Sequence, residues 1–390
     1  MIRYRSARIA AAVVTLLWLL AADARAWQLE EFYRGTRAMG MGGAYTAVAD
    51  DADSVFYNPA GLALNSNYEF RLINPKIDLS TDDIGVVSDL RAAATKLDGP
   101  TLTKLFGQHI YGDVGVFPVV YFPGVALGYY YNAQTHIVSR NLAFPQIEAS
   151  YTKDNGVVGG IGHEFKGFAK RQFLRAGVSV KWLSRQGFRQ TIPLSKLVTA
   201  DKTYLTSLTS ASATGWGATP GIQYEIGLDR SNELLLGTAW QDIGDMTFGN
   251  DLQANRPPPV RSNLSAGMAF VHRFSPTARA TNNFKLSAEV RHLTQTDVDP
   301  RLRLHAGAEL QVGSVSLQAG IAQDSLCLGA KLDMFFLEVS AVTYGVENQS
   351  VAFMDREQRY MLQLTLKFDV MGKQKPPERD EDRRKHPRSY

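Results

Sequence analysis

Cysteine and long apolar runs are almost missing from this chain of 390 residues. The single cysteine, Cys327, excludes an intrachain disulfide framework and a cysteine-ligated zinc cluster. The longest uncharged apolar stretch, 9–22, has 14 residues, whereas a membrane-spanning helix needs about 20. With 45% hydrophobic and 21% charged residues, the sequence is too apolar for a disordered protein and too polar for a helical transporter.

Residues 1–26 have the pattern of an export signal. Three arginines, Arg3, Arg5 and Arg8, precede the apolar run 9–22, and Ala24-Arg25-Ala26 supplies a small-x-small cleavage site. We therefore expect the mature chain to begin at Trp27. The segment holds four arginines and one aspartate, so the rest of the chain carries a formal charge of +1 rather than +4. That balance gives no support to nucleic-acid binding.

Much of the remaining chain alternates between apolar and polar residues. Segment 284–291 reads FKLSAEVR, in which F, L, A and V alternate with K, S, E and R. Segments 174–182, 301–312 and 360–368 repeat this period of two. Successive side chains of a strand point to opposite faces, so each segment predicts a strand with one apolar and one polar face.

Such strands fit two architectures. A soluble sandwich buries the apolar faces, whereas a membrane barrel turns them to lipid and encloses the polar ones. The export signal favours the barrel, as do the strand lengths, because a strand crossing a bilayer takes about 9–11 residues and soluble strands average about 5–6. Aromatic residues near strand ends, such as Trp182, Trp240 and Tyr344, are typical of an interfacial girdle. We therefore predict an all-β, antiparallel transmembrane β-barrel.

Fifteen segments read as strands: 68–77, 115–122, 125–133, 146–153, 157–165, 173–184, 214–226, 233–241, 262–273, 283–293, 301–312, 315–322, 326–332, 336–344 and 359–368. Bacterial single-chain barrels have an even number of strands. Long stretches at 185–213, 242–261 and 345–358 alternate with short turns if 146–153, which lies between Pro145 and Asp154-Asn155-Gly156, belongs to an outer loop over 134–156. The sequence thus predicts a 14-stranded barrel over 68–370.

Both ends of the expected mature chain lack the period of two. Residues 371–390 carry Pro376-Pro377 and a mixed-charge run, which predicts a disordered periplasmic tail, with a peptidoglycan or partner contact as the alternative. Residues 27–67 are rich in glycine, and 44–48 and 52–55 read as short helical pieces. A barrel this wide is an open pore unless something fills it. We therefore expect 27–67 to form a partly helical plug, or hatch, in the lumen.

Three blocks in this segment carry a family resemblance: Arg37-Ala38-Met39-Gly40-Met41-Gly42-Gly43-Ala44, Ala49-Asp50-Asp51 and Asn58-Pro59-Ala60-Gly61. The stretch resembles the FadL/TodX superfamily of outer-membrane transporters for hydrophobic compounds, including its PorV-like relatives. The resemblance implies a hatch inside the barrel. We expect its holding and gating residues among Gly40, Gly42, Gly43, Asp50, Asp51, Asn58, Pro59 and Ala60, because Asn58 can bond both wall and hatch backbone while Pro59 fixes the local dihedral.

The resemblance also implies a route. In fatty-acid transporters of the family, ligand moves from an outer apolar groove to a pocket near the hatch, and leaves through a gap made by a kink in the third strand. The third strand here is 125–133, where Gly128 would permit such a kink. PorV-like members use the same architecture in protein secretion, so the resemblance leaves two functions open.

Enzyme chemistry has little support. His163-Glu164-Phe165-Lys166-Gly167 begins like a zinc-protease motif but has glycine where the second histidine is needed. The sequence contains no phosphate-loop motif and no Gly-x-Ser-x-Gly elbow. We predict no catalytic residue, no cofactor and no metal site, and we do not expect an enzyme.

Cations on the polar strand faces have two interpretations. Arg175, Lys181, Arg291 and Arg303 are expected to face the lumen, alongside carboxylates such as Glu309. They either form a salt-bridged wall that holds the plug, or bind the carboxylate of an amphipathic ligand, since arginine pairs with carboxylates bidentately.

The favoured function is passive uptake of hydrophobic or amphipathic small molecules, fatty acid-like or hydrocarbon, through an outer-membrane channel. An apolar groove formed by 185–213 and 242–261 would favour it. The alternative is a PorV-like barrel that serves as a secretion or assembly scaffold with partner proteins. The expected contacts are a hydrophobic ligand and outer-membrane lipid, without nucleic acid, and the chain is expected to be a monomer.

Overall fold

The computed structural model describes residues 31–65, 68–80, 109–140, 146–167, 169, 171–193, 212–249, 256–274, 282–348 and 355–370. The expected export signal and charged tail lie outside these residues. Within them the helices are short: α2 (Thr36–Gly40), α3 (Ser54–Tyr57), and the 3₁₀ turns η1 (Pro59–Leu64) and η2 (Pro300–Arg303). None of these described helices is long and apolar enough to span a membrane.

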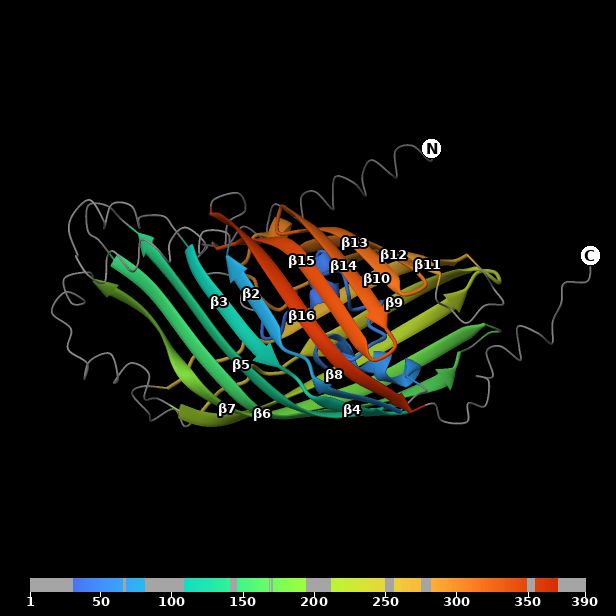
Figure 1. Ribbon diagram of the computed structural model, residues 1–390, viewed down its shortest axis with the longest axis horizontal. Coiled ribbons are helices and arrows are strands. Elements are labelled where there is room, and N and C mark those ends of the chain that lie inside the picture. The colour runs from blue at the N-terminus through green and yellow to red at the C-terminus, as the bar shows by residue number, and fades with distance from the viewer. Residues whose placement is uncertain are drawn as a thin grey trace, which may run out of the picture.

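Sixteen β-segments of the described chain form one antiparallel sheet (Figure 1). They are β1 (Tyr68–Ile73), β2 (Lys76–Ser80), β3 (His109–Val116), β4 (Val119–Phe122), β5 (Val125–Arg140), β6 (Gln146–Lys166), β7 (Gln172–Pro193), β8 (Ser212–Gly227), β9 (Asn232–Gln241), β10 (Asn263–Arg273), β11 (Asn283–Val290), β12 (Leu304–Val312), β13 (Val315–Ala322), β14 (Ser325–Met334), β15 (Leu337–Glu347) and β16 (Arg356–Val370).

Two pairs of these segments are halves of single wall strands. β1 and β2 both pair with β16, and β3 and β4 both pair with β5. We call β1 with β2 the first wall strand, and β3 with β4 the second. Since β16 also pairs with β15, the sheet closes on itself. The 16 segments therefore make the predicted closed barrel of 14 strands.

The outer loop predicted over 134–156 is wrong. Residues 146–153 belong to β6, which pairs without interruption with β5 and with β7. The sequence Asp154-Asn155-Gly156 stays extended because the Asp154 carboxylate accepts two hydrogen bonds, both 2.7 Å, from Arg185 on β7. Two of the fifteen predicted strands are thus one long strand, and the correct count of 14 arises by joining them. β5 to β7 extend beyond the rest of the wall (Figure 1).

Three further boundaries differ from the prediction. β7 continues to Pro193, so the long connection expected from residue 185 begins later. The strand expected from residue 301 starts at Leu304, because Asp299 caps the turn η2 by accepting a hydrogen bond from the amide of Arg301. In the hatch, α2 covers 36–40, whereas the predicted helical piece 44–48 contains no helix and has a turn over 46–48.

The two faces of the wall have opposite chemistry. Leu362 and Trp216 are 54% and 70% exposed on the outside, whereas Arg175, Lys181 and Glu309 are buried on the inside. A soluble protein buries its apolar face, and a contiguous apolar outer surface of this size is typical of a lipid-facing one. The pattern is that of a membrane barrel.

Leu362→Arg should destabilise the barrel by about 2–4 kcal/mol, because Leu362 lies near the middle of β16 and faces outward. Val315→Arg, on the same face but next to the turn at Gly313, should cost only about 0–1 kcal/mol. Reversible unfolding in lipid vesicles measures both. Equal costs would mean that the outer face does not contact a bilayer core.

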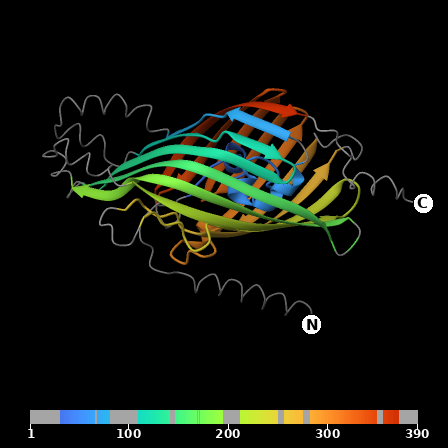
Figure 2. The same ribbon diagram turned by 90° about the horizontal axis from the view of Figure 1, so that it is seen from below.

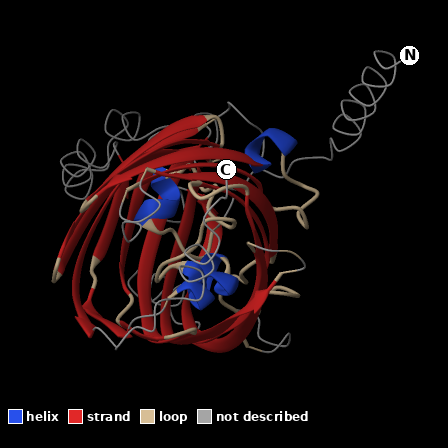
Figure 3. Cartoon of the chain, turned by 90° about the vertical axis from the view of Figure 1, so that its right-hand side faces the viewer, coloured by secondary structure: helices blue, strands red, loops and turns tan. Residues whose placement is uncertain are grey.

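The hatch lies inside the ring of strands. Figure 3 looks along the barrel and shows helical segments in the space that the strands enclose. Figure 2 shows the N-terminal hatch between opposite sides of the barrel. α2 packs on β13, β14 and β15, while η1 packs on β6, β7 and β8. The hatch therefore spans the lumen and contacts nearly opposite parts of the wall.

Candidate functional site

Lumen-facing glycines on the wall provide the seats for the hatch. A Cβ at Gly177 on β7 would lie 2.4 Å from the carbonyl carbon of Pro59, and one at Gly221 on β8 would lie 2.0 Å from Oδ1 of Asn58. Their neighbour Gly162 on β6 meets the same hatch segment, and the three glycines are directly paired across the strands. Glycine in a strand marks close approach of another backbone, and here that backbone is the hatch.

A second set of glycines seats the other end of the hatch. A Cβ at Gly307 on β12 would lie 2.1 Å from the Met41 oxygen, and one at Gly320 on β13 would lie 2.4 Å from the Gly42 nitrogen. Gly42 and Gly43 have φ of 63° and 79°, the left-handed region that favours glycine. Gly40, for its part, rests against Gln318 and Gly329.

Asn58 connects the hatch to the wall. Its side chain is fully buried, and its Nδ2 donates to the carbonyl oxygens of Thr46 (2.9 Å) and Ile222 on β8 (3.1 Å). Its Oδ1 accepts from the amide of Ala60 at 3.2 Å and so caps η1, with Pro59 in the first turn. The side-chain amide of Asn58 therefore bonds backbone groups of the hatch and of one wall strand.

Asn58→Ala should leave a folded, heat-modifiable barrel but loosen the hatch. The substitution removes the acceptor of the Ala60 amide and one donor each from the carbonyl oxygens of Thr46 and Ile222. Loss of a buried hydrogen-bond partner costs about 1–3 kcal/mol. Hatch amides should then exchange faster with deuterium, and uptake or ion leak should change. Asn283→Ala, which removes a wall bond to Gln311 on β12, is the control. Unchanged hatch exchange in Asn58→Ala would contradict a holding role.

A buried ion cluster forms the second connection. Arg37 of α2 donates to both carboxylate oxygens of Glu309 on β12 at 2.8 and 2.6 Å, and its NH1 contacts Asp50 at 2.5 Å and Asp51 at 3.0 Å. Lys285 on β11 reaches Asp50 at 2.8 Å. Burial alone would raise the pKa of Asp50, but Arg37 and Lys285 hold that pKa well below its usual range. Asp50 is therefore ionised and joins hatch to wall.

We expect Asp53 to make docking of the hatch depend on pH. Burial, reinforced by the neighbouring Asp51 charge, raises the pKa of Asp53 to about 7. Tyr33 donates to its Oδ1 at 2.7 Å. Because the docked hatch binds a proton that the undocked one releases, docking should weaken as pH rises from about 4 to 7 and stay level above that.

Asp53→Asn should remove this pH dependence, because the amide keeps an acceptor for Tyr33 and does not ionise. Hydrogen exchange of hatch peptides at several pH values, corrected for intrinsic rates, provides the measurement. If the hatch of the parent protein is equally protected from hydrogen exchange at pH 5 and pH 8, Asp53 does not control its docking.

The four cations predicted to face the lumen differ in their surroundings. Arg175 is held by Glu164 and Glu225, and Lys181 contacts Asp242 at 2.7 Å. Arg291 reaches Glu31 at 2.8 Å, whereas Arg303 lies in η2 and donates to the carbonyl oxygen of Val298. The first three are paired with carboxylates of this chain, an arrangement that favours the salt-bridged wall over a ligand-carboxylate site.

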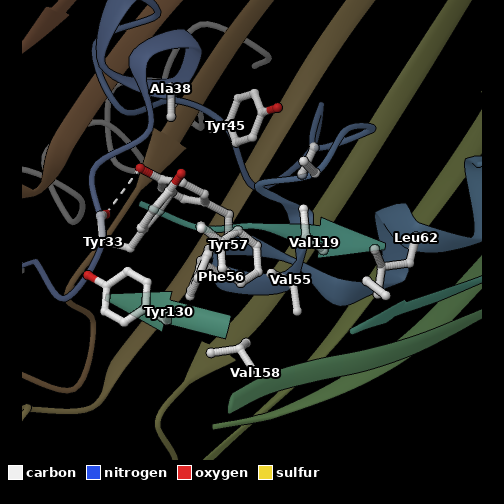
Figure 4. Packing of buried hydrophobic residues seen from close by; sticks show 14 of the residues in the cluster. Tyr33, Ala38, Tyr45, Val55, Phe56, Tyr57, Leu62, Val119, Tyr130 and Val158 are labelled. Atoms are coloured by element: carbon white, nitrogen blue, oxygen red, sulfur yellow. Dashed lines mark hydrogen bonds between the residues drawn. The ribbon is translucent and has the colours of Figure 1, made fainter. Parts of the chain in front are cut away.

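Aromatic side chains of hatch and wall meet at one point of the lumen. Phe56 stacks on Tyr33 with ring centroids 4.0 Å apart and contacts Phe117 of the wall at 4.8 Å and Tyr130 on β5 at 5.5 Å. Figure 4 shows Tyr33, Phe56 and Tyr130 packed together with Val158 on the neighbouring strand. The apolar core of the hatch is thus continuous with apolar residues of the wall.

The wall is interrupted at this same point. The first wall strand breaks at Asn74-Pro75 and the second at Phe117-Pro118. The Asn74 side chain replaces the missing ladder: its Oδ1 accepts from the Phe117 amide, and its Nδ2 donates to the Phe117 carbonyl. A cavity of about 10 Å³ adjoins Asn74, Phe117 and Tyr130, which is room for about one water molecule.

The kink predicted at Gly128 is not in its own strand. β5 pairs continuously with β6 through Gly128. A Cβ at Gly128 would lie 2.7 Å from both the Phe117 ring and the Pro118 oxygen. Gly128 therefore makes room for the break in the neighbouring second wall strand.

The apolar cluster extends from the hatch to the end of the barrel that carries the long loops. It continues through Tyr130, Val158 and Leu183 to Met246 and Phe248 of the β9–β10 connection. This connection folds onto β8, where Gly215 leaves room for Thr247 and Phe248. A single buried apolar cluster thus joins the mouth, the hatch and the wall interruption.

Sequence reasoning missed the wall glycines and the paired breaks. Both breaks contain a proline, which cannot donate to a ladder and is confined to edges and irregular sites of sheets. The seats of the hatch share another signal, since Gly162, Gly177 and Gly221 fall on the polar, lumen-facing positions of their strands. Small residues at such positions indicate that something approaches the wall from inside.

Fold and site together define a closed membrane barrel that is plugged by its own N-terminal segment. No protein-family model and no curated protein matches the chain. Among solved structures it is similar to the Pseudomonas putida toluene transporter TodX, with 11% identity over 88% of this chain and 99% of that one and a TM-score of 0.40. It is also similar to the Ralstonia pickettii toluene transporter TbuX (14%, over 87% and 98%, TM-score 0.42) and to the CymD monoaromatic hydrocarbon channel (11%, over 87% and 98%, TM-score 0.42).

Proposed function

We propose that this chain is an outer-membrane channel for passive uptake of hydrophobic or amphipathic small molecules. The observation that carries the proposal is the apolar cluster that connects Phe248 at the mouth, through Leu183 and Val158, to the hatch. The rest of the lumen is lined by paired charges. An apolar cluster that continues beyond the core of the hatch to the mouth of a charge-lined barrel favours apolar cargo.

The proposed path is closed at rest. Side chains fill the cluster, and the adjoining cavity of about 10 Å³ is far smaller than the roughly 300–1,000 Å³ of a small-molecule site. Cargo would therefore have to displace aromatic side chains such as Phe117 and Tyr130. We propose that it leaves between the first and second wall strands, where two side-chain hydrogen bonds of Asn74 stand in for the ladder.

The cargo class follows from the charges. Arg175, Lys181 and Arg291 are already paired with carboxylates, so a ligand carboxylate would have to displace a protein one. We therefore propose that recognition rests on the apolar body of the cargo, such as a hydrocarbon or an acyl chain. Toluene and monoaromatic hydrocarbons are the compounds named for the similar solved structures.

Leu183→Asn tests whether cargo passes along this apolar cluster. It keeps the side-chain size but places an amide in the apolar cluster, at a cost of about 1–3 kcal/mol if the amide finds no partner. Uptake of a labelled hydrophobic compound by cells should fall about tenfold or more. Leu326→Asn, on the outer face at the start of β14, is the matched control and should transport normally.

Equal uptake by the Leu183→Asn variant and by the parent protein would show that cargo does not pass along this apolar cluster.

Mass spectrometry of small molecules that co-purify with the protein would identify the cargo. We further propose cleavage after Ala26 and fractionation with the outer membrane. A barrel that assembles there but transports no hydrophobic compound would favour the secretion-scaffold alternative.

A further inference from the structure

Three metal-ligating side chains from distant parts of the chain meet in the lumen: His109 on β3, His136 on β5 and Glu357 on β16. Nδ1 of His109 lies 3.4 Å from Nε2 of His136 and 3.9 Å from Oε2 of Glu357. Nε2 of His136 lies 3.7 Å from the same carboxylate oxygen. His109 and Glu357 are each 3% exposed. The three ligand atoms therefore form a nearly equilateral triangle inside the barrel.

The triangle has the size of one face of a tetrahedral metal site. Ligands that are about 2.0–2.1 Å from a tetrahedral zinc ion lie roughly 3.3 Å from one another. The three separations here, 3.4, 3.7 and 3.9 Å, would have to shorten by about 0.1 to 0.6 Å to reach that spacing. Two imidazoles with one carboxylate suit zinc and similar divalent transition metals rather than magnesium or calcium, which prefer oxygen ligands.

A second carboxylate orients the first histidine. Nε2 of His109 lies 2.8 Å from Oδ1 of Asp355. A proton on Nε2, shared with Asp355, leaves the lone pair of Nδ1 directed at His136 and Glu357. Carboxylate–histidine pairs of this kind support most histidine ligands of metal ions, because they fix the tautomer and raise the basicity of the ligating nitrogen.

Asn348 offers a fourth ligand next to the triangle. The side-chain amide of Asn348 lies 3.1 Å from Nδ1 of His109 and 3.0 Å from Oε2 of Glu357. Among the described residues, no hydrogen-bond partner is found for its Oδ1 or for Oε1 of Glu357, although both atoms are buried. Turning the amide by 180° would direct Oδ1 at the triangle. Such a turn is favourable only if a cation occupies the site, because Oδ1 would otherwise face a carboxylate.

Arg359 is a cation in contact with the cluster. Its guanidinium donates to Oε2 of Glu357 at 2.6 Å and packs over the ring of Tyr111, 3.4 Å from the centroid. The arginine orients the carboxylate, and Oε2 keeps a second lone pair that can bind the ion. Together with Asp355 and Glu357 it makes the cluster anionic by one charge when both histidines are neutral, which favours a divalent cation.

We propose that His109, His136 and Glu357, with the amide oxygen of Asn348, bind one divalent transition metal ion of the zinc type. The ion would join β16, the last wall strand, to β3 and β5 close to Ser80 of β2, which pairs with Arg359 on β16. The metal is a clamp across the seam where the barrel closes, and this role does not depend on what the barrel transports.

Zinc titration of the folded, tag-free, chelator-treated protein tests the site. One equivalent should bind tightly, and cobalt should give the intense visible absorption of a tetrahedral site. His136→Ala and Glu357→Gln should each weaken binding by at least about 100-fold, and Asp355→Asn by about 10- to 100-fold. His163→Ala, on the exposed end of β6, should bind like the parent protein.

A measurement on the parent protein alone keeps the test valid if a variant fails to assemble. Zinc at one equivalent should raise its unfolding temperature, as expected when a ligand binds only the folded state. Binding well below one equivalent would overturn the proposal. Equal affinity in the parent protein and in Glu357→Gln would also overturn it, because zinc would then bind elsewhere.

Discussion

Alanine at Gly177 and Gly221 together is expected to release the hatch and turn the barrel into an ion-conducting pore. Each new methyl group would meet hatch atoms at 2.4 Å or less, namely Pro59 carbonyl atoms and Asn58 Oδ1. Real Cβ atoms do not approach so closely, and the backbone of η1 cannot shift away without leaving its seat. An empty barrel of 14 strands leaves an aqueous channel, so single-channel current in a planar bilayer should rise from near zero to that of a large pore.

Gly112→Ala and Gly159→Ala are the controls for this experiment. Both glycines lie in strands, but a Cβ there would meet nothing nearer than 3.8 Å and 3.4 Å respectively. Both variants should stay closed, since alanine fits a strand at least as well as glycine. A double variant at Gly177 and Gly221 that remains closed would mean that the hatch does not depend on these seats.

Arg37→Ala is expected to have the second largest effect. Arg37 is the shared partner of Asp50, Asp51 and Glu309, and its removal leaves Lys285 as the remaining cation of this cluster. Breaking a buried ion pair from one side costs about 3–5 kcal/mol, because charge is left buried without compensation. The hatch should lose its protection from hydrogen exchange, and the barrel should leak ions without losing its folded state.

A charge-neutral variant separates electrostatics from packing. Arg37→Met combined with Glu309→Gln removes one cation and one carboxylate together, so the hatch should recover part of its protection. Arg37→Met alone should behave like Arg37→Ala. If the double variant is as damaged as the single one, the contribution of Arg37 lies in its geometry and not in charge balance.

Periodicity predicted most of the wall, because a lipid-facing and a lumen-facing side must alternate along every strand. It failed where a local signal was overridden by a tertiary contact. Asp154-Asn155-Gly156 is a turn sequence in isolation, but the ion pair with Arg185 keeps it in β6. The first and second wall strands were predicted as continuous, although Asn74-Pro75 and Phe117-Pro118 break them.

The candidate site was predictable only in part. Asn58 stood out because asparagine before proline can serve the backbone of two segments at once, and the structure places it between hatch and β8. The partners of Arg37 and the cluster of His109, His136 and Glu357 could not be predicted, because they come from strands far apart in sequence. Their proximity depends on the register around the closed barrel, which periodicity alone does not fix.

We propose that the barrel stays closed to water and ions while it admits apolar molecules. The most direct measurement follows entry of an apolar tracer and of potassium into the same vesicles, with a lipopolysaccharide outer leaflet and the parent protein inserted. We expect faster entry of the tracer than into protein-free vesicles, with potassium still excluded, and loss of the tracer effect in Leu183→Asn. Entry of both solutes, or of neither, would contradict it.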